Sequence, residues 1–166
     1  MKTILGIDPG LQRTGWGIIT VNGSHLGFVA AGTISSDPKA DLPTRLVQID
    51  AELTRVIELY RPHSAGVEET FMNNNAASAL KLGQARGVAL CVPARMGLPV
   101  ASYAANLVKK TVVGVGHADK AQIGMMIKTL LPASGKLGAD AADALAIAIC
   151  HAHHGATQDK LRAAIA

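Results

Sequence analysis

The sequence predicts a single α/β domain built on a mixed sheet with helices on both faces. Three observations lead to this expectation. The chain has 166 residues, of which 49% are hydrophobic and 17% charged, so it can bury one sizeable core. Three segments rich in strand formers come first, and helical and strand patterns alternate after them. Helical patterns fill most of the last third. This balance excludes a largely disordered chain and leaves no room for two ordinary domains.

The first three segments, residues 3–7, 14–21 and 25–34, are rich in Ile, Val and Thr. Asn22 and Gly23 lie between the second and third segments and favour a two-residue type I′ hairpin, because both positions tolerate a positive φ. We therefore expect these two strands to be antiparallel. Asp8, Pro9 and Gly10 fit a tight turn after the first strand.

Helices and strands are expected to alternate over the rest of the chain. Apolar residues recur at steps of three and four after Asp41, a plausible N-cap, and predict a helix that closes at Pro62. The remaining patterns predict strands at 64–68 and 98–102, a turn near 71–74, and helices at 76–92, 104–111, 119–131 and 139–154, with a glycine loop at 114–117. Residues 1–156 form the expected domain, and residues 157–166 a flexible C-terminal tail.

Targeting and redox features are sparse. The apolar run at residues 4–7 is too short for a secretory signal, and no stretch reaches the length of a membrane span. Cys91 and Cys150 lie among small apolar residues in helical stretches, where free thiols are usually buried, and two such cysteines make no disulfide framework. We expect a cytoplasmic protein without membrane contact.

The charge is unevenly distributed along the chain. Residues 81–136 carry eight Lys and Arg against one Asp, a net of +7, whereas residues 1–80 carry −2 and residues 137–166 carry −1. A basic middle of this kind suits a polyanion such as nucleic acid, although solvated helix faces would also produce it.

Four acidic residues are candidates for a metal site. Asp8 and Glu68 each end an apolar strand, and open α/β sheets bind ligands at that carboxyl edge. Successive strand residues point to opposite faces, so only one of Glu68 and Glu69 can share a site with Asp8. Asp140 and Asp143 are three residues apart and lie on one helix face. Taken singly, Asp8 could equally be a turn aspartate, a lone glutamate such as Glu68 is more often a surface residue, and Asp140 and Asp143 could be carboxylates that stabilise the helix dipole.

Together the four carboxylates form an all-oxygen set, which favours Mg²⁺ or Mn²⁺ over Zn²⁺. The last helix is otherwise small or apolar near Asp140 and Asp143, so a bound cation would offset the cost of their burial. Two such ions roughly 4 Å apart can activate a water and stabilise the leaving 3′ oxygen in phosphodiester hydrolysis. Beside a segment of net +7, this combination indicates a nuclease.

Four segments of the chain resemble the RuvC family, the bacterial Holliday junction resolvases. They are GIDPGLQRTGWG, VEETFMNNNAASALKLGQARG, VKKTVVGVGHADK and ADAADALAIAICH, which together extend from about residue 3 to 154. The resemblance implies a ribonuclease H-like fold whose five-stranded mixed sheet has three antiparallel and then two parallel strands. It also implies a homodimer that makes paired, Mg²⁺-dependent cuts across four-way junction DNA in recombination and repair, with the branch-migration proteins RuvA and RuvB as partners.

The resemblance further implies the roles of individual residues. The catalytic and metal-binding carboxylates of the family fall on Asp8, Glu68, Asp140 and Asp143, and Glu69 stands where the family needs no acid. The family's DNA-contacting positions fall on Phe71, Lys109 and Lys120. An aromatic ring such as that of Phe71 can replace a lost neighbour of the unstacked bases at a crossover, although core packing would explain it too.

A two-fold dimer also suits a substrate with approximate two-fold symmetry. The helix at 76–92, which carries Leu80 and Leu82, is the expected interface. His151, His153 and His154 are expected to end the last helix, where a positive charge is favourable, and a part in proton transfer stays open.

Three other interpretations are weaker. Actin-like ATPases and sugar kinases share the first glycine-rich motif but repeat the core in two domains. A smaller YqgF-type nuclease would match the last helix and the 112–120 loop less fully. A junction-binding module without nuclease activity would not need all four carboxylates.

Overall fold

Five strands form one mixed sheet in the computed structural model, which describes residues 1–69 and 75–165, with side chains up to residue 155. The strands are β1 (Lys2–Asp8), β2 (Arg13–Asn22), β3 (His25–Ser35), β4 (Ser64–Glu69) and β5 (Val100–Ala104), in the order β3-β2-β1-β4-β5. Strand β2 pairs antiparallel with β1 and β3, whereas β4 pairs in parallel with β1 and β5. The predicted mixed sheet is confirmed.

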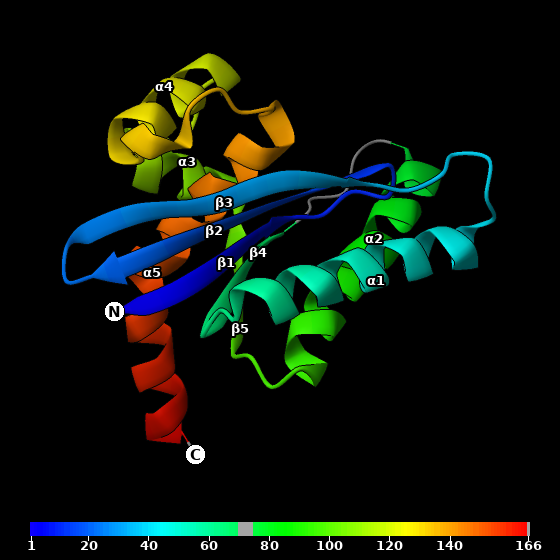
Figure 1. Ribbon diagram of the computed structural model, residues 1–166, viewed down its shortest axis with the longest axis horizontal. Coiled ribbons are helices and arrows are strands. Elements are labelled where there is room, and N and C mark those ends of the chain that lie inside the picture. The colour runs from blue at the N-terminus through cyan, green and yellow to red at the C-terminus, as the bar shows by residue number, and fades with distance from the viewer. Residues whose placement is uncertain (70–74, 166) are drawn as a thin grey trace.

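Helices cover both faces of this sheet (Figure 1). Helices α1 (Leu42–Tyr60) and α2 (Ala76–Arg95) cover one face, and α3 (Ala105–Val113), α4 (Lys120–Leu130) and α5 (Ala139–Ile165) cover the other. A short 3₁₀ turn, Pro132–Ser134, follows α4. The core therefore has two halves, one under α1 and α2 and one under α5, separated by the sheet.

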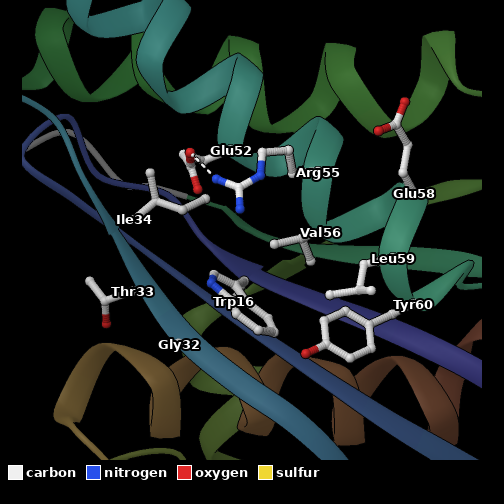
Figure 2. A pocket seen from close by; sticks show the side chains of 10 residues that line it. All are labelled: Trp16, Gly32, Thr33, Ile34, Glu52, Arg55, Val56, Glu58, Leu59 and Tyr60. Carbon is white, nitrogen blue, oxygen red and sulfur yellow. Dashed lines mark hydrogen bonds and ion pairs between the residues drawn. The ribbon is translucent and has the colours of Figure 1, made fainter.

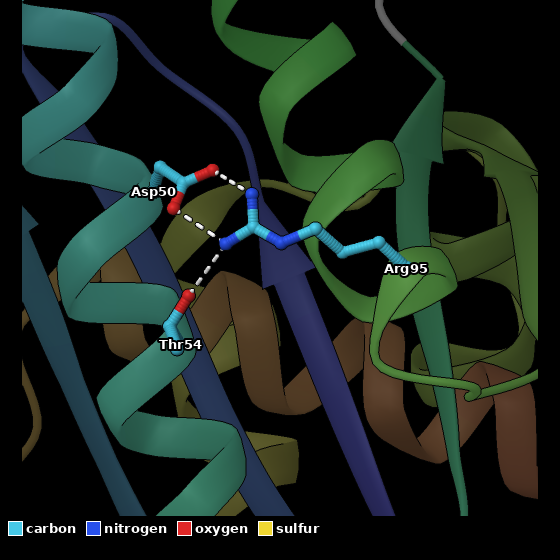
Figure 3. A network of polar contacts seen from close by, with 3 residues as sticks. All are labelled: Asp50, Thr54 and Arg95. Carbon is cyan, nitrogen blue, oxygen red and sulfur yellow. Dashed lines mark hydrogen bonds and ion pairs between the residues drawn. The ribbon is translucent and has the colours of Figure 1, made fainter.

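Helix α1 begins and ends where the sequence predicts. The Asp41 side chain accepts a hydrogen bond from the Thr44 backbone N–H at 3.0 Å, which satisfies one of the free donors of the first turn. A salt bridge also fastens α1 to α2, since the Arg95 guanidinium contacts both carboxylate oxygens of Asp50, at 2.5 and 2.6 Å, and the Thr54 hydroxyl at 2.9 Å (Figure 3). The two helices of this face are thus joined by packing and by a bidentate ion pair.

Two predicted boundaries are wrong in detail. Asn22 pairs with His25, so the hairpin loop is Gly23 and Ser24, and within it only Gly23 takes a positive φ, of 60°. That pattern fits a turn with glycine in its first position and not the expected type I′ turn. Helix α5 continues to Ile165, beyond the expected end at residue 154, because good helix formers follow residue 155 and no proline interrupts them.

The two cysteines differ from each other. Cys150 is buried in α5 as predicted, but Cys91 is exposed, because it belongs to the side of α2 that faces away from the sheet. The turn expected near 71–74 lies outside the described residues. No helix in the described part of the chain is long and apolar enough to cross a membrane.

Candidate active site

Strand register brings Asp8 and Glu68 to the same face of the sheet. Ile7 pairs with Val67, and both are buried in the core half under α1 and α2. The next residue of each strand must point the opposite way, toward α5, and these residues are Asp8 and Glu68. Glu69 then faces the α1 and α2 side, so Glu68 is the glutamate that shares a face with Asp8.

These two carboxylates meet Asp143 of α5 in a pocket of about 540 Å³ at the carboxyl edge of β1 and β4. Lys109 of α3 and Lys120 of α4 line the same pocket, together with Ala105, Ala118, Asp119 and Ile123. Five of the predicted site residues are therefore neighbours, although they come from five different elements.

Asp140 lies one turn before Asp143 and beside the pocket, outside its lining. Its carboxylate is 3.9 Å from the Arg13 guanidinium, and its charge raises the pKa of Asp8. Asp140 is thus within electrostatic reach of the site while keeping an exposed cationic partner of its own.

Glycines in β1 and β2 allow α5 to approach the sheet closely enough to form the site. A Cβ atom at Gly15 would lie 2.1 Å from the Asp140 carbonyl oxygen, and one at Gly6 would lie 2.0 Å from the Ala144 carbonyl oxygen. Gly15 also pairs directly with Asp8 across β1 and β2. Because Gly6 and Gly15 carry no side chain, the first turn of α5 can pack directly against the end of β1.

Burial and negative neighbours raise the pKa of Asp8 to about 7. Desolvation is the largest cause, followed by the charges of Glu68, Asp143 and Asp140, while Lys120 acts in the opposite direction. In the folded protein this carboxyl therefore exchanges its proton near neutral pH.

The same environment acts on the two other pocket carboxylates. Burial raises the pKa of Glu68, with a further increase from Asp143 and partial compensation by Lys109 and Lys120. Burial likewise raises the pKa of Asp143, which Lys120 lowers and Asp140 raises. A cluster with three raised carboxyl pKa values gains most from a further positive charge.

Lys109 and Lys120 supply positive charge to the same pocket. The Lys120 ammonium is 3.7 Å from an Asp143 oxygen, and its side chain is 79% exposed. Lys120 is the first residue of α4, and a capping box stabilises this end of the helix. In it, the Asp119 side chain accepts from the Gln122 backbone N–H, and the Gln122 side chain accepts from the Asp119 backbone N–H. Lys120 can thus neutralise the cluster and still reach a phosphate in solvent.

The donor set suits a hard divalent cation. It consists of carboxylate oxygens, whose pKa values are raised first by burial and then by neighbouring carboxylates, so a bound cation would stabilise their charged forms. As the described side chains lie, no group of three or more His, Cys, Asp or Glu could hold a metal ion. The carboxylates would therefore have to turn toward an ion as it binds.

Sequence reasoning missed two arginines beside the site. Arg13 contacts Asp140, and Arg86 of α2 donates hydrogen bonds to the Glu68 backbone carbonyl at 3.1 Å and to the Ser102 hydroxyl at 2.9 Å. Arg86 thereby holds the end of β4 to β5.

The close approach of α5 to the sheet did have a signal in the sequence. Gly15 and Gly17 lie within a predicted strand, and a glycine within a strand marks a close approach of another backbone.

Two of the three predicted histidines, His151 and His154, have structural partners, and none of the three ends the helix, because α5 continues past them. His151 is buried, with its Nδ1 2.7 Å from the Tyr103 hydroxyl and its Nε2 2.8 Å from the Ser64 hydroxyl. Ser64 begins β4, at the opposite end from Glu68. His154 Nε2 is 3.1 Å from the Thr111 hydroxyl. The expected helix-end placement is therefore wrong, and Phe71 lies outside the described residues.

The chain is similar in sequence to known proteins over most of its length. The family model described as crossover junction endodeoxyribonuclease RuvC matches residues 4–151. The protein of that description from Sinorhizobium medicae is 59% identical over 154 residues, which cover 93% of this chain and 92% of the relative. The one from Rhizobium johnstonii is 56% identical over 163 residues, 98% of this chain and 96% of the relative.

The fold of the chain is also similar to those of solved structures. Thermus thermophilus RuvC in complex with a Holliday junction substrate superposes with a TM-score of 0.86 at 30% identity, covering 93% of this chain and 95% of that one. The yeast mitochondrial Holliday junction resolvase has a TM-score of 0.63 at 14% identity, covering 89% and 77%, and so shares the fold. The ribonuclease H-like fold is confirmed, and the chain belongs to the RuvC family of crossover junction endodeoxyribonucleases.

Proposed function

We propose that this chain is an Mg²⁺-dependent, structure-selective endonuclease that resolves four-way DNA junctions by paired, symmetrical phosphodiester cuts. One observation carries the proposal. Three carboxylates with raised pKa values share a pocket with two lysines at the carboxyl edge of the sheet. Carboxylates can hold cations and lysines can hold the phosphate backbone, and a nuclease needs both.

Each residue then has a distinct task. The metal would be two Mg²⁺ ions, or Mn²⁺ ions in their place, held by the four carboxylates of Asp8, Glu68, Asp140 and Asp143. Bound there, the ions would activate the attacking water and stabilise the leaving 3′ oxygen. Arg86 keeps the Glu68 backbone in place through its 3.1 Å hydrogen bond.

The remaining predicted residues would bind the substrate. Lys109 and Lys120 would position the scissile strand against the carboxylates by neutralising its phosphates, and Phe71 would stack on a base at the crossover. This division leaves metal binding to the carboxylates and most of the DNA affinity to the cations.

The dimer and the biological setting belong to the same proposal. Leu80 on the outer side of α2 is 65% exposed, and Gly83 and Gly87 on this helix have open space around them, so a second copy could pack closely there. Two copies related by a two-fold axis would present one site to each of two opposed strands. We place this dimer in cytoplasmic recombination and repair, where RuvA and RuvB move the junction.

A cleavage assay with a synthetic four-way junction and a linear duplex of matched sequence tests the function. With Mg²⁺ we expect paired cuts in the junction, little cutting of the duplex, and no cutting with a chelator. Equal cutting of the duplex would contradict structure selectivity, and binding without cutting under any metal would indicate a junction-binding module.

Two carboxylate variants test the division of roles. Asp8→Asn and Asp140→Asn should abolish cutting and leave junction binding within about threefold of the unmodified protein, since phosphate neutralisation supplies most of the affinity. A gel shift measures binding. Loss of binding in both variants would show that the carboxylates hold the fold or the DNA, and not only the metal.

A further inference from the structure

A second, smaller pocket lies where β1 turns into β2, on the side of the sheet that α1 and α2 cover. It has a volume of about 240 Å³. Its lining comes from the β1–β2 turn, from α1 and from the first two turns of α2: Leu11, Gln12, Arg45, Ser78, Lys81 and Leu82. We call it the basic pocket. None of its residues has a task in the reaction proposed above.

The basic pocket is cationic, and its cations have no acidic partner. Arg45 and Lys81 are the charged residues of its lining, which gives it a net charge of +2. In the described part of the chain, neither side chain lies within 4 Å of a carboxylate. The Ser78 hydroxyl and the Gln12 amide add neutral hydrogen-bond donors. Two cations and two neutral donors around one small hollow suit a phosphate group.

Hydrogen bonds fix the Arg45 side chain in place before any ligand arrives. Its guanidinium donates from Nε to the Ser36 hydroxyl at 2.9 Å and from Nη2 to the Leu11 carbonyl at 3.4 Å. Ser36 is buried and donates to the same carbonyl at 2.5 Å. Among the described residues, Nη1 of Arg45 has no hydrogen-bond partner. A side chain that is held in this way and still has free donors loses little conformational freedom when it binds a ligand.

The β1–β2 turn connects the basic pocket with the carboxylates. Gln12 lines the basic pocket, whereas the next residue, Arg13, lies 3.9 Å from the Asp140 carboxylate of α5. Consecutive Cα atoms are about 3.8 Å apart, so the two places are close enough for one DNA strand to touch both.

Pocket size alone does not make a phosphate site. The groove between α1 and β3 has a larger volume, about 610 Å³, but the one cation of its lining, Arg55, is 2.8 Å from Glu52 (Figure 2). Glu52 therefore neutralises this arginine, whereas Arg45 and Lys81 have no such partner. We expect a phosphate in the basic pocket and none in the groove.

We propose that the basic pocket binds a backbone phosphate of the junction strand that is cut, a few nucleotides from the scissile bond. Arg45 and Lys81 neutralise this phosphate, and Ser78 and Gln12 donate hydrogen bonds to its oxygens. The inference rests on the proposed function, because it assigns a second anchor to the same substrate. The two lysines of the carboxylate pocket lie on the α5 side and the basic pocket on the α1 side, so the strand is held at two separate points.

Single methylphosphonates, each of which removes the charge of one phosphate, locate the contact on a synthetic four-way junction. Binding is measured with a chelator, so that nothing is cut. A methylphosphonate at one position of the cut strand, outside the scissile phosphate, should weaken binding by the unmodified protein at least about threefold and binding by Lys81→Ala not at all. Lys81→Arg keeps the charge and should keep the sensitivity. The same pattern for Lys81→Ala and the unmodified protein would overturn the proposal, as would a sensitive position on an uncut strand.

Salt dependence and cutting rate give an independent test. Lys81→Ala should bind the junction more weakly and with a salt slope smaller by about one, so its deficit should shrink about fourfold between 50 and 200 mM salt. Its single-turnover cutting rate at saturating protein should equal that of the unmodified protein, because the basic pocket holds no catalytic group. Lys2→Ala, at the opposite end of β1 from Asp8, is the matched control and should change neither value.

The outcomes separate this inference from the proposed function. If Lys81→Ala binds as tightly as the unmodified protein and with the same salt slope, the basic pocket holds no phosphate, although junction cutting stands. A slower cutting rate at saturating protein would place Lys81 in the catalytic site and overturn the separate anchor. If the unmodified protein neither binds nor cuts the junction, the proposed function fails, and this inference fails with it.

Discussion

At the scale of one residue, the charged carboxylate of Asp8 lowers the stability of the metal-free fold. Its carboxyl loses a proton near pH 4 in the unfolded chain but only at about pH 7 in the folded one. The folded state therefore binds more protons between these values, and the free energy of unfolding falls as the pH rises from about 4 to 7. Without metal, the charged form of Asp8 destabilises the fold that positions it.

Replacing Asp8 with Asn should consequently stabilise the metal-free protein. We expect a gain on the order of 2 kcal/mol in the free energy of unfolding at pH 8, which shrinks toward pH 5 and is absent below pH 4. Urea unfolding at these pH values measures it. Glu69→Gln, on the other sheet face, is the control and should change little. Mg²⁺ should stabilise the unmodified protein more than the variant, and a gain independent of pH would contradict this explanation.

Lys109 carries a different residue-scale prediction, which concerns binding. Its side chain lines the carboxylate pocket and lowers the pKa of Glu68, so we expect it to meet a DNA strand that enters the pocket. Lys109→Ala should weaken junction binding and reduce the slope of log K against log salt by about one unit, the loss of one phosphate contact. Titrations at several salt concentrations measure the slope. Arg55→Ala on α1 should leave it unchanged, and an unchanged slope for Lys109→Ala would rule out a direct phosphate contact.

At the scale of elements, the position of α5 on the sheet determines whether the acids meet. The helix supplies Asp140 and Asp143, and its first turn rests on glycines where any side chain would collide with its backbone. Gly15→Ala should therefore displace that turn by enough to reduce cleavage at least about a hundredfold while junction binding stays within about threefold. Single-turnover cleavage and a gel shift give the two values.

A matched variant shows whether the added methyl or its position matters. A Cβ atom at Gly124 of α4 would point into open space, with no neighbouring side chain within 4 Å, so Gly124→Ala should keep full cleavage. Full cleavage by Gly15→Ala would mean that α5 tolerates a shift and that the close approach is not needed for the site.

Elements with strong local signals were predictable, and so was the part of the site that they carry. Alternation in β4 allowed only one of Glu68 and Glu69 to share a face with Asp8, and the i, i+3 spacing placed Asp140 and Asp143 on one face of α5. Contacts between elements were not predictable in this way. The Arg13 contact with Asp140 and the Arg86 bond to the Glu68 carbonyl join residues far apart in sequence, and no local pattern marks them.

At the scale of the whole molecule, the sheet separates two surfaces with different charge and chemistry. The carboxylate pocket and its lysines open on the α5 side, while the outer side of α2 belongs to the other layer. A dimer formed through α2 would therefore leave the carboxylate pocket accessible. This arrangement predicts that each protomer cuts one strand with a site of its own.

Mixed dimers test this prediction directly. Equal amounts of the unmodified chain and Asp8→Asn, unfolded together and refolded, should give about half mixed dimers, each with one working site. On a plasmid with an extruded cruciform, these should nick one strand and accumulate nicked circles, whereas unmodified dimers should make both cuts and yield linear DNA. Leu80→Asp should disrupt the α2 interface, sediment as a monomer and lose paired cutting while keeping its secondary structure. If the mixed dimers yielded linear DNA as fast as the unmodified ones, one site would suffice for both strands and the two-fold arrangement would be wrong.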